Sequence, residues 1–182
     1  MGGELGDDVE VTILNRLVTW VGGKLTYGAD PKHAQLVCQE AGLDPGSKGL
    51  TCPTVKVTVE DALHEGESLK SREATQYPAT GATSNFQSQD RPDIQFAAKE
   101  ACRDMSAPKV ASQAKVKRLA RYLVEFPRLV WQFGEWGVQP DNLVTYSDSD
   151  WAGCVKTRRS TSGGVATLGN CGIKTWSSTQ SV

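Results

Sequence analysis

The stretch from residue 144 to residue 182 constrains the fold more than any other part of this chain. It opens with a β-run at 144–151, and two further β-runs follow at 165–168 and 173–177. The last two runs are joined by Gly-Asn-Cys-Gly at 169–172, which has the composition of a hairpin turn. The sequence therefore predicts a meander of three antiparallel strands.

The first of these strands carries two carboxylates. Side chains alternate between the faces of a strand, so Tyr146, Asp148 and Asp150 share one face. Neighbouring carboxylates repel each other unless water or a cation lies between them, and Mg²⁺ prefers such oxygen ligands. This face is therefore a candidate cation site, and we interpret Asp150 as a residue that organises the following loop rather than as a ligand. The alternative is that the two aspartates are simply exposed to solvent on an edge strand.

The loop at 156–164 mixes cations with hydroxyl groups and glycines. This composition suits the binding of phosphate. The predicted nucleic-acid-binding residues here are Lys156, Arg158 and Arg159. The alternative is that these three side chains are ordinary solvated surface cations.

Three ordered motifs in this region carry a resemblance to a known family. They are Tyr-Ser-Asp-Ser-Asp-Trp-Ala-Gly at 146–153, Arg-Arg-Ser-Thr-Ser-Gly-Gly at 158–164 and Lys-Thr-Trp-Ser-Ser-Thr-Gln at 174–180. Together they resemble the opening of the ribonuclease H domain of copia-type LTR retrotransposon polyproteins. The resemblance implies a catalytic role for Asp148 in two-metal hydrolysis with Mg²⁺, whose further acids lie on the next helix and on later strands. Because the chain stops at Val182, we expect a truncated ribonuclease H-like fold in which Asp148 is catalytic only in a complete domain and Mg²⁺ is not bound by the fragment.

The N-terminal part predicts a β-hairpin followed by a helix. Residues 11–21 are β-branched and aromatic and favour one strand, which Gly22-Gly23 turns into a second strand. Asp30-Pro31 is typical of a helix start, and Gly42 of a helix end. With Ala-Asp-Pro-Lys-His-Ala at 29–34, this part resembles the end of the copia-type reverse transcriptase domain.

Two amphipathic helices follow in the middle of the chain. Their predicted buried stripes are Ile94, Ala97, Ala101 and Met105 in the first helix, and Val116, Leu119, Ala120 and Leu123 in the second. Ser-Gln-Asp-Arg-Pro-Asp-Ile-Gln-Phe-Ala at 88–97 and Lys-Arg-Leu-Ala-Arg-Tyr-Leu at 117–123 resemble the connection segment between reverse transcriptase and ribonuclease H. A β-run at 129–133 is expected to lead into the ribonuclease H part.

The stretch 73–89 departs from the family pattern of a continuous amphipathic helix. Pro78 and Gly81 lower helix stability by about 3 and 1 kcal/mol when they lie inside a helix. We therefore expect a helix that starts late or frays.

The predicted fold class is α+β: a β-hairpin and helix, a helical connection segment, and a three-stranded antiparallel meander that opens a truncated ribonuclease H-like fold. The predicted domains are the end of a reverse transcriptase-like domain at 1–47, an acidic solvated linker at 48–72, the connection segment at 73–140 and the start of ribonuclease H at 141–182.

Charge favours a nucleic-acid partner only locally. The 20 basic and 21 acidic residues of the chain nearly cancel, but residues 91–131 hold nine basic residues against four acidic ones. The polar face of the second amphipathic helix carries Lys117, Arg118 and Arg121, which we interpret as phosphate-binding. The alternative is a solvated helix face. Trp151 and Trp176 are expected to pack against the strands rather than to stack on bases.

Several classes of protein are disfavoured. Five cysteines without a Cys-x-x-Cys pair, and only two histidines, argue against a disulfide framework or a zinc site. No apolar run reaches membrane-spanning length and the N-terminus lacks a signal-peptide core, so we expect an intracellular protein of the cytoplasm or nucleus. Asp7-Asp8 lies in a polar, glycine-rich setting unlike a polymerase site.

The resulting functional prediction is a fragment of a retrotransposon Pol polyprotein. Its parent is an RNA-directed DNA polymerase with ribonuclease H activity, and the fragment is expected to be inactive alone. The expected partners are an RNA–DNA hybrid or other nucleic acid and the rest of the polyprotein, with no membrane. The alternative is a non-catalytic nucleic-acid-binding remnant or a degenerate product.

Overall fold

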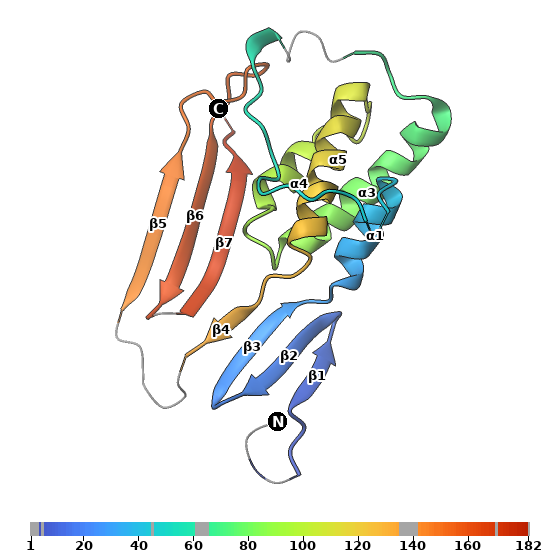
Figure 1. Ribbon diagram of the computed structural model, residues 1–182. Helices are drawn as coiled ribbons and strands as arrows, with labels where there is room; N and C mark the ends of the chain where they lie inside the picture. Colours follow the sequence, from blue (N-terminus) through green and yellow to red (C-terminus); the bar gives the residue numbers. More distant parts are fainter. Residues whose placement is uncertain are drawn as a thin grey trace.

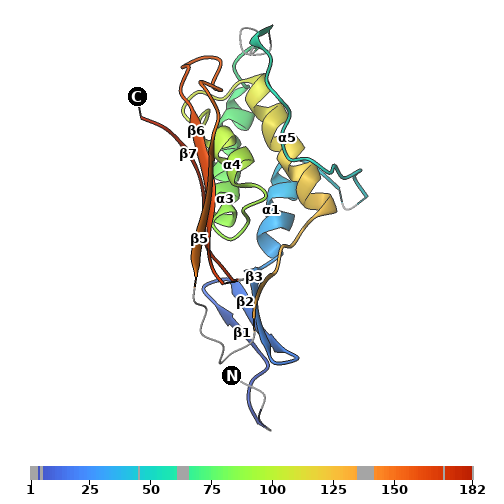
Figure 2. The same ribbon diagram turned by 90° about the vertical axis from the view of Figure 1, so that its left-hand side faces the viewer.

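The computed structural model describes residues 4, 6–44, 46–60, 66–134, 142–169 and 171–181. Within these ranges the chain forms two antiparallel sheets and four helices (Figure 1). One sheet has the strand order β1-β2-β3-β4, and the other has the order β5-β6-β7. Figure 2 shows the second sheet nearly edge-on, with the helices on one side of it.

The first sheet begins with three short strands, which are β1 (Glu10–Ile13), β2 (Arg16–Val21) and β3 (Lys24–Ala29). The single strand predicted at 11–21 is wrong, because the chain reverses at Leu14 and Asn15. Both residues have left-handed backbone angles, with φ of 50° and 61°. Asparagine tolerates this conformation, but the apolar residues on either side hide the turn in the sequence. The predicted turn at Gly22-Gly23 is confirmed.

Strand β4 (Trp131–Phe133) completes this sheet by pairing antiparallel with β3. Tyr27 of β3 lies opposite Trp131, the first residue of β4. The β-run predicted at 129–133 therefore forms a strand of the first sheet. A Cβ added to Gly28 would lie 2.8 Å from the carbonyl oxygen of Leu129, so this close approach requires glycine.

Helix α1 (Lys32–Glu40) starts and ends where predicted. The Asp30 carboxylate accepts a hydrogen bond from the Lys32 backbone N–H at 2.9 Å, which satisfies a donor of the first turn. Gly42 ends the helix with φ of 73°.

Helices α4 (Gln95–Cys102) and α5 (Val110–Glu125) bury the predicted stripes against α1. One core cluster consists of Ala34, Val37, Ile94, Ala97, Leu119, Ala120 and Leu123. Val116 and Ala101 belong to a second cluster with Tyr77 of α3, and Met105 packs on it partly buried. The two predicted amphipathic helices are confirmed.

Helix α3 (Ser71–Ser88) runs without interruption through Pro78, so the predicted late or frayed helix is wrong. Packing compensates for the weak helix propensity. The Tyr77 side chain is 4% exposed, and its hydroxyl donates to the Ala101 carbonyl at 2.8 Å. Gly81 lets α3 approach Met105, whose Sδ lies only 3.0 Å from the position of an added Cβ. Tertiary contacts override local propensity here.

A carboxylate between α3 and α4 ties the first sheet to the helices. Asp90 accepts hydrogen bonds from Arg16 Nε at 2.9 Å and from the Tyr27 hydroxyl at 2.5 Å. The indole N–H of Trp131 donates to the Asp90 backbone carbonyl at 2.9 Å. Burial, and then the neighbouring Asp90, raise the pKa of Tyr27 to about 12. Strands β2, β3 and β4 therefore all bind one residue of the connection.

The next residue, Arg91, is 1% exposed and holds the end of α5. Its guanidinium contacts the Asp93 carboxylate at 2.7 Å and the Phe126 carbonyl at 2.8 Å. The Tyr122 hydroxyl donates to the same carboxylate at 2.9 Å. The Asp-Arg-Pro-Asp sequence thus links the chain before α4 to the end of α5 through an ion pair whose two members have further hydrogen-bond partners.

The first residues of the predicted linker lie against α5. Arg121 Nε donates to the Lys48 carbonyl at 2.9 Å, and the Leu50 N–H donates to the Arg121 carbonyl at 3.1 Å. Figures 1 and 2 both show this segment alongside α5. Residues 61–65 of the predicted linker lie outside the described residues, and so does the predicted boundary at 140/141.

The second sheet contains β5 (Leu143–Ser149), β6 (Thr161–Leu168) and β7 (Cys171–Thr179). The predicted meander is confirmed, but β6 starts at Thr161 and so includes the end of the predicted loop. Asn170 of the predicted turn lies outside the described residues. The sheet meets α4 at β7, where Gln95 Nε2 donates to Thr175 Oγ1 at 2.8 Å. A ribonuclease H-like fold stays a prediction.

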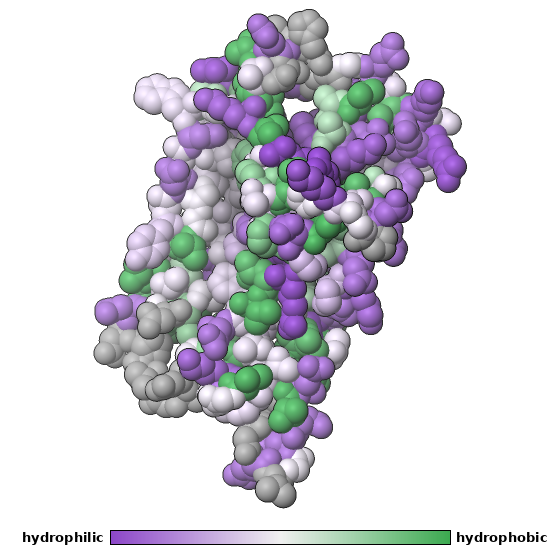
Figure 3. Space-filling view, in the orientation of Figure 1, coloured by the Kyte–Doolittle hydropathy of each residue, from purple (hydrophilic) through white to green (hydrophobic). Residues whose placement is uncertain are grey.

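Strand β5 forms the outer edge of this sheet, and every one of its residues is exposed. Figure 3 shows hydrophilic side chains over much of the helical part and a hydrophobic patch at the lower end of the β5–β7 sheet. The exposed apolar side chains at the start of β5 are Leu143 and Val144. Among the described residues, each helix is too short or too polar to cross a lipid bilayer.

Candidate nucleic-acid interface

The structure separates the two groups of predicted phosphate-binding residues. On α5, Lys117 is exposed, whereas Arg118 and Arg121 are half-buried. Arg121 is engaged with the segment that lies across the helix, and Arg118 Nε is buried with no hydrogen-bond partner among the described residues. The face of α5 therefore offers one fully exposed cation of the predicted three.

The loop between β5 and β6 presents the other group. Lys156, Arg158 and Arg159 are all exposed. Two backbone hydrogen bonds close the loop around them, from the Cys154 N–H to the Arg159 carbonyl at 3.1 Å and from the Arg158 N–H to the Cys154 carbonyl at 2.8 Å. Arg158 takes a left-handed backbone angle, with φ of 55°. The loop is thus a narrow hairpin on which all three cations are exposed.

The base of the loop is fixed by Asp150. Its backbone N–H donates to the Thr161 carbonyl at 3.1 Å, and its carboxylate accepts the Thr161 N–H. One step further out, the Ala152 N–H donates to Ser160 Oγ at 2.9 Å. The predicted role of Asp150 as a loop-organising residue is confirmed.

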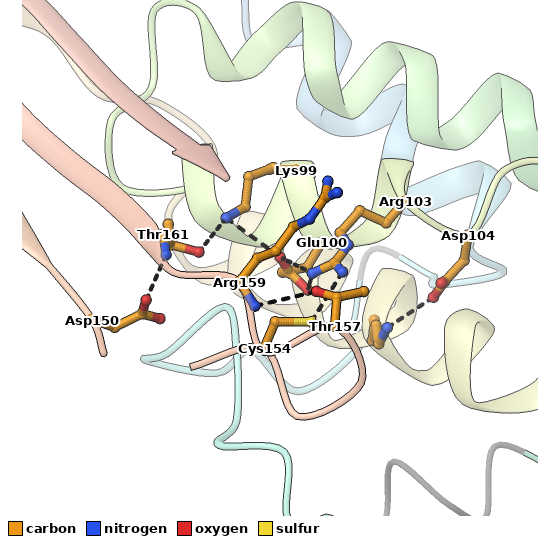
Figure 4. A network of polar contacts seen from close by, with 10 residues as sticks. Lys99, Glu100, Arg103, Asp104, Asp150, Cys154, Thr157, Arg159 and Thr161 are labelled. Atoms are coloured by element: carbon orange, nitrogen blue, oxygen red, sulfur yellow. Dashed lines mark hydrogen bonds and ion pairs between the residues drawn. The ribbon is translucent and has the colours of Figure 1, made fainter. Parts of the chain in front are cut away.

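Helix α4 and the residue directly after it supply two further cations next to this loop. Arg103 Nη2 lies 3.0 Å from the Cys154 sulfur, and Lys99 Nζ lies 2.9 Å from Thr161 Oγ1. Figure 4 shows Lys99, Arg103 and Arg159 in one region, with Cys154 between the helix and the loop. We call Lys99, Arg103, Lys156, Arg158 and Arg159 the basic cluster.

The Cys154 thiol is itself part of this electrostatic arrangement. Burial raises its pKa, but hydrogen bonds with Thr157 and the Arg103 guanidinium outweigh burial and bring the pKa down to about 7. The same hydrogen bond raises the pKa of Arg103. A thiolate paired with a guanidinium therefore fastens the loop to α4 near neutral pH.

Cations outnumber carboxylates in the basic cluster. Figure 4 shows three carboxylates near the cluster, Glu100, Asp104 and Asp150, of which Asp104 is paired with Lys115 at 2.8 Å. Glu100 contacts Lys99 at 3.4 Å and Arg103 at 3.3 Å, which leaves the loop cations Arg158 and Arg159 facing solvent. A polyanion is the ligand that such a surface attracts.

Sequence reasoning missed the contribution of α4 to this site. Lys99 and Arg103 are four residues apart and so share a helix face. That spacing was the available signal, but nothing in the sequence shows that this face meets a loop some fifty residues later. The contact is a consequence of how the β5–β7 sheet packs on α4.

A polar cavity of about 360 Å³ lies beside Lys99, between α3, α4 and β7. Its lining includes the amide side chains of Asn85, Gln89 and Gln95 and the hydroxyl groups of Thr175 and Ser177. The cavity places uncharged donors and acceptors next to Lys99 of the basic cluster.

Trp151 is 94% exposed at the base of the loop, so the prediction that it packs against the strands is wrong. Its neighbours are held by backbone hydrogen bonds that leave the indole in solvent. Trp176 behaves as predicted, because its ring lies so close to Gly164 that a Cβ added there would overlap it.

Asp148 lies on the exposed edge strand β5, opposite Gly163 of β6 and, one strand further, Ser177 of β7. None of these neighbours is a carboxylate. Within the described ranges, no three His, Cys, Asp or Glu side chains are grouped closely enough to hold a metal ion together. The described residues therefore do not form a ligand set for a pair of Mg²⁺ ions.

The sequence is similar to two known proteins. It is 29% identical over 150 residues to the uncharacterized mitochondrial protein AtMg00810 of Arabidopsis thaliana, a match that covers 80% of this chain and 58% of that protein. It is 37% identical over 100 residues to secreted RxLR effector protein 161 of Plasmopara viticola, a match that covers 55% of this chain and 68% of that protein. The chain belongs to the same family as RxLR effector protein 161.

This family assignment rests on sequence alone. No family model matches the chain. No solved structure matches it. The chain spans less than two thirds of the Arabidopsis relative.

Proposed function

We propose that the chain derives from the Pol polyprotein of a copia-type retrotransposon and that its own activity is nucleic-acid binding. The polyprotein would be an RNA-directed DNA polymerase with ribonuclease H activity, and the chain would correspond to the end of reverse transcriptase, the connection and the start of ribonuclease H. The similarity to proteins of two very different organisms supports a transposon-related origin. The ordered motifs at 146–153, 158–164 and 174–180 support the finer assignment.

The observation that carries the binding proposal is the basic cluster. The loop brings Lys156, Arg158 and Arg159 to the surface on a hydrogen-bonded hairpin, and α4 adds Lys99 and Arg103. Arginine and lysine contact the phosphates of any nucleic acid, irrespective of its sequence. RNA–DNA hybrid, duplex and single strand are all ligands for such a surface.

We derive no hydrolytic step for the chain. Cleavage by two metal ions needs several carboxylates around the ions, and the described residues offer Asp148 without such neighbours. Asp148 would become a metal ligand where further acids are supplied beside it, as the family resemblance implies for a complete ribonuclease H domain.

The test is fluorescence anisotropy with a labelled RNA–DNA hybrid, a DNA duplex and a single strand, measured between about 50 and 200 mM salt. We expect binding that weakens with salt. The triple variant Lys156→Gln, Arg158→Gln, Arg159→Gln should lower the slope of log K against log salt by about 2–3, because each lost phosphate contact removes about 0.9 for a duplex.

The matched control replaces three exposed lysines away from the loop, Lys32, Lys48 and Lys56, with glutamine. It removes the same net charge. If both triple variants lose the same affinity, the attraction is a general charge effect and the assignment to the loop is refuted. Absence of binding to all three ligands at low salt would refute the proposed function itself.

A further inference from the structure

Trp151 stands out from every other apolar side chain on the described surface. It is 94% exposed, whereas Tyr146 on the preceding strand β5 is 64% exposed and Leu14, in the tight β1–β2 turn, is 78% exposed. Tryptophan has the largest apolar surface to bury and so contributes most when it is removed from water. An indole left this far out in solvent is available to a ligand.

The backbone that presents the indole is fixed on both sides. Asp150 is bound to Thr161 through two hydrogen bonds, and the Ala152 N–H donates to Ser160 Oγ. Ala152 has a left-handed φ of 50°, which turns the chain directly after Trp151. The backbone that carries the ring therefore needs no further ordering when a ligand binds.

The same hairpin carries exposed cations. The Ala152 N–H, directly after Trp151, donates to Ser160 Oγ across the loop, and Ser160 directly follows the exposed Arg158 and Arg159 in the chain. An exposed aromatic ring and exposed cations on one hairpin suit contact with a base and its phosphates together.

We infer that Trp151 is a stacking platform for an unpaired nucleobase, so that the loop prefers single-stranded nucleic acid to duplex. In a duplex both faces of each base are already stacked, whereas a base in a single strand offers a free face to an aromatic side chain. This inference rests on the proposed function, since the basic cluster supplies the phosphate contacts. It adds the class of nucleic acid that the site selects.

The test uses one labelled oligothymidine strand, free and annealed to its complement, in fluorescence anisotropy. Trp151→Ala should weaken binding of the free strand about tenfold and leave duplex binding unchanged. Trp151→Phe keeps an aromatic face and should retain most of the affinity. Because the ring is exposed, both variants should unfold at the same temperature as the unmodified chain.

Tyr146→Ala is the matched control, since it removes another exposed aromatic ring, five residues earlier on the strand that leads into the loop. We expect it to leave both affinities unchanged. Equal losses in Tyr146→Ala and Trp151→Ala would refute the assignment to Trp151, as would an unchanged single-strand affinity in Trp151→Ala.

Two other outcomes are also decisive. If the triple loop variant weakens binding while Trp151→Ala does not, the proposed function stands and the stacking inference falls. If the tryptophan emission of the free protein shifts with protein concentration and Trp151→Ala abolishes the shift, the ring is buried between copies of the chain and the inference is overturned.

Discussion

Two neighbouring glycines in β6 have opposite surroundings, and replacing each with alanine tests the packing of the β5–β7 sheet. A Cβ added to Gly164 would overlap the Trp176 ring and lie 2.6 Å from the Tyr146 carbonyl oxygen. A Cβ added to Gly163 would meet only the Trp176 carbonyl oxygen, at 3.8 Å. The first position has no room for a methyl group and the second has.

The size of the effect follows from these contacts. Overpacking a filled site costs about 1–3 kcal/mol, and a backbone oxygen of β5 cannot move aside without disturbing the strand pairing. The lower chain entropy of alanine in the unfolded state returns about 0.4–1 kcal/mol at both positions. We expect Gly164→Ala to lose about 1–2 kcal/mol of unfolding free energy and Gly163→Ala to gain up to about 1 kcal/mol.

Urea unfolding followed by circular dichroism and tryptophan fluorescence measures both variants on the same scale. The dependence of the free energy on urea should be unchanged, so that the midpoint alone reports stability. Equal midpoints for the two variants would refute the reasoning, because the only difference between them is the space around the new methyl group.

Four further predictions follow from the rest of the chain. Asp90→Ala should cost about 2–4 kcal/mol in urea unfolding, because a carboxylate whose side chain is 8% exposed leaves its donors without an acceptor. The unfolding free energy should fall as the pH rises from 10 to about 12, because the folded chain keeps the Tyr27 proton that the unfolded chain releases. The slope from this group is at most about 1.4 kcal/mol per pH unit. Tyr27→Phe should remove this contribution from the pH dependence of stability. Pro78→Ala should raise the unfolding free energy by about 1–2 kcal/mol, because it restores a helix hydrogen bond inside α3; an unchanged urea midpoint would contradict this. Mg²⁺ at about 10 mM should leave the melting temperature unchanged, whereas a site at Asp148 with a Kd of about 1 mM would stabilise the fold by about 1.4 kcal/mol.

The sequence predicted well those helices whose buried apolar residues recur at the helical period. In α5, the positions Val116, Leu119, Ala120 and Leu123 repeat at the helical period and are buried as one stripe. In α3 the local signals point the other way, because Pro78 and Gly81 oppose a helix that other parts of the chain stabilise. No window of the sequence contains those partners.

The candidate site was likewise predicted from the sequence only in part. The composition of the β5–β6 loop predicted its exposed cations, because charged residues among glycines and hydroxyl groups belong on the surface. The role of Lys99 and Arg103 depends on a contact between a helix and a distant loop, which local pattern does not encode. The exposure of Trp151 depends on the hydrogen bonds of its neighbours, and tryptophan's general preference for burial pointed away from it.

The pairing of β3 with β4 has a consequence for how this chain can be rebuilt. The chain leaves the first sheet after Ala29 and returns to it at Trp131, which pairs with Tyr27, so the two ends of the helical part lie close together. A segment with adjoining ends can be lengthened, shortened or exchanged while the strands on either side keep their register. The helical part is thus a long insertion between β3 and β4, and its residue Asp90 is hydrogen-bonded to β2, β3 and β4.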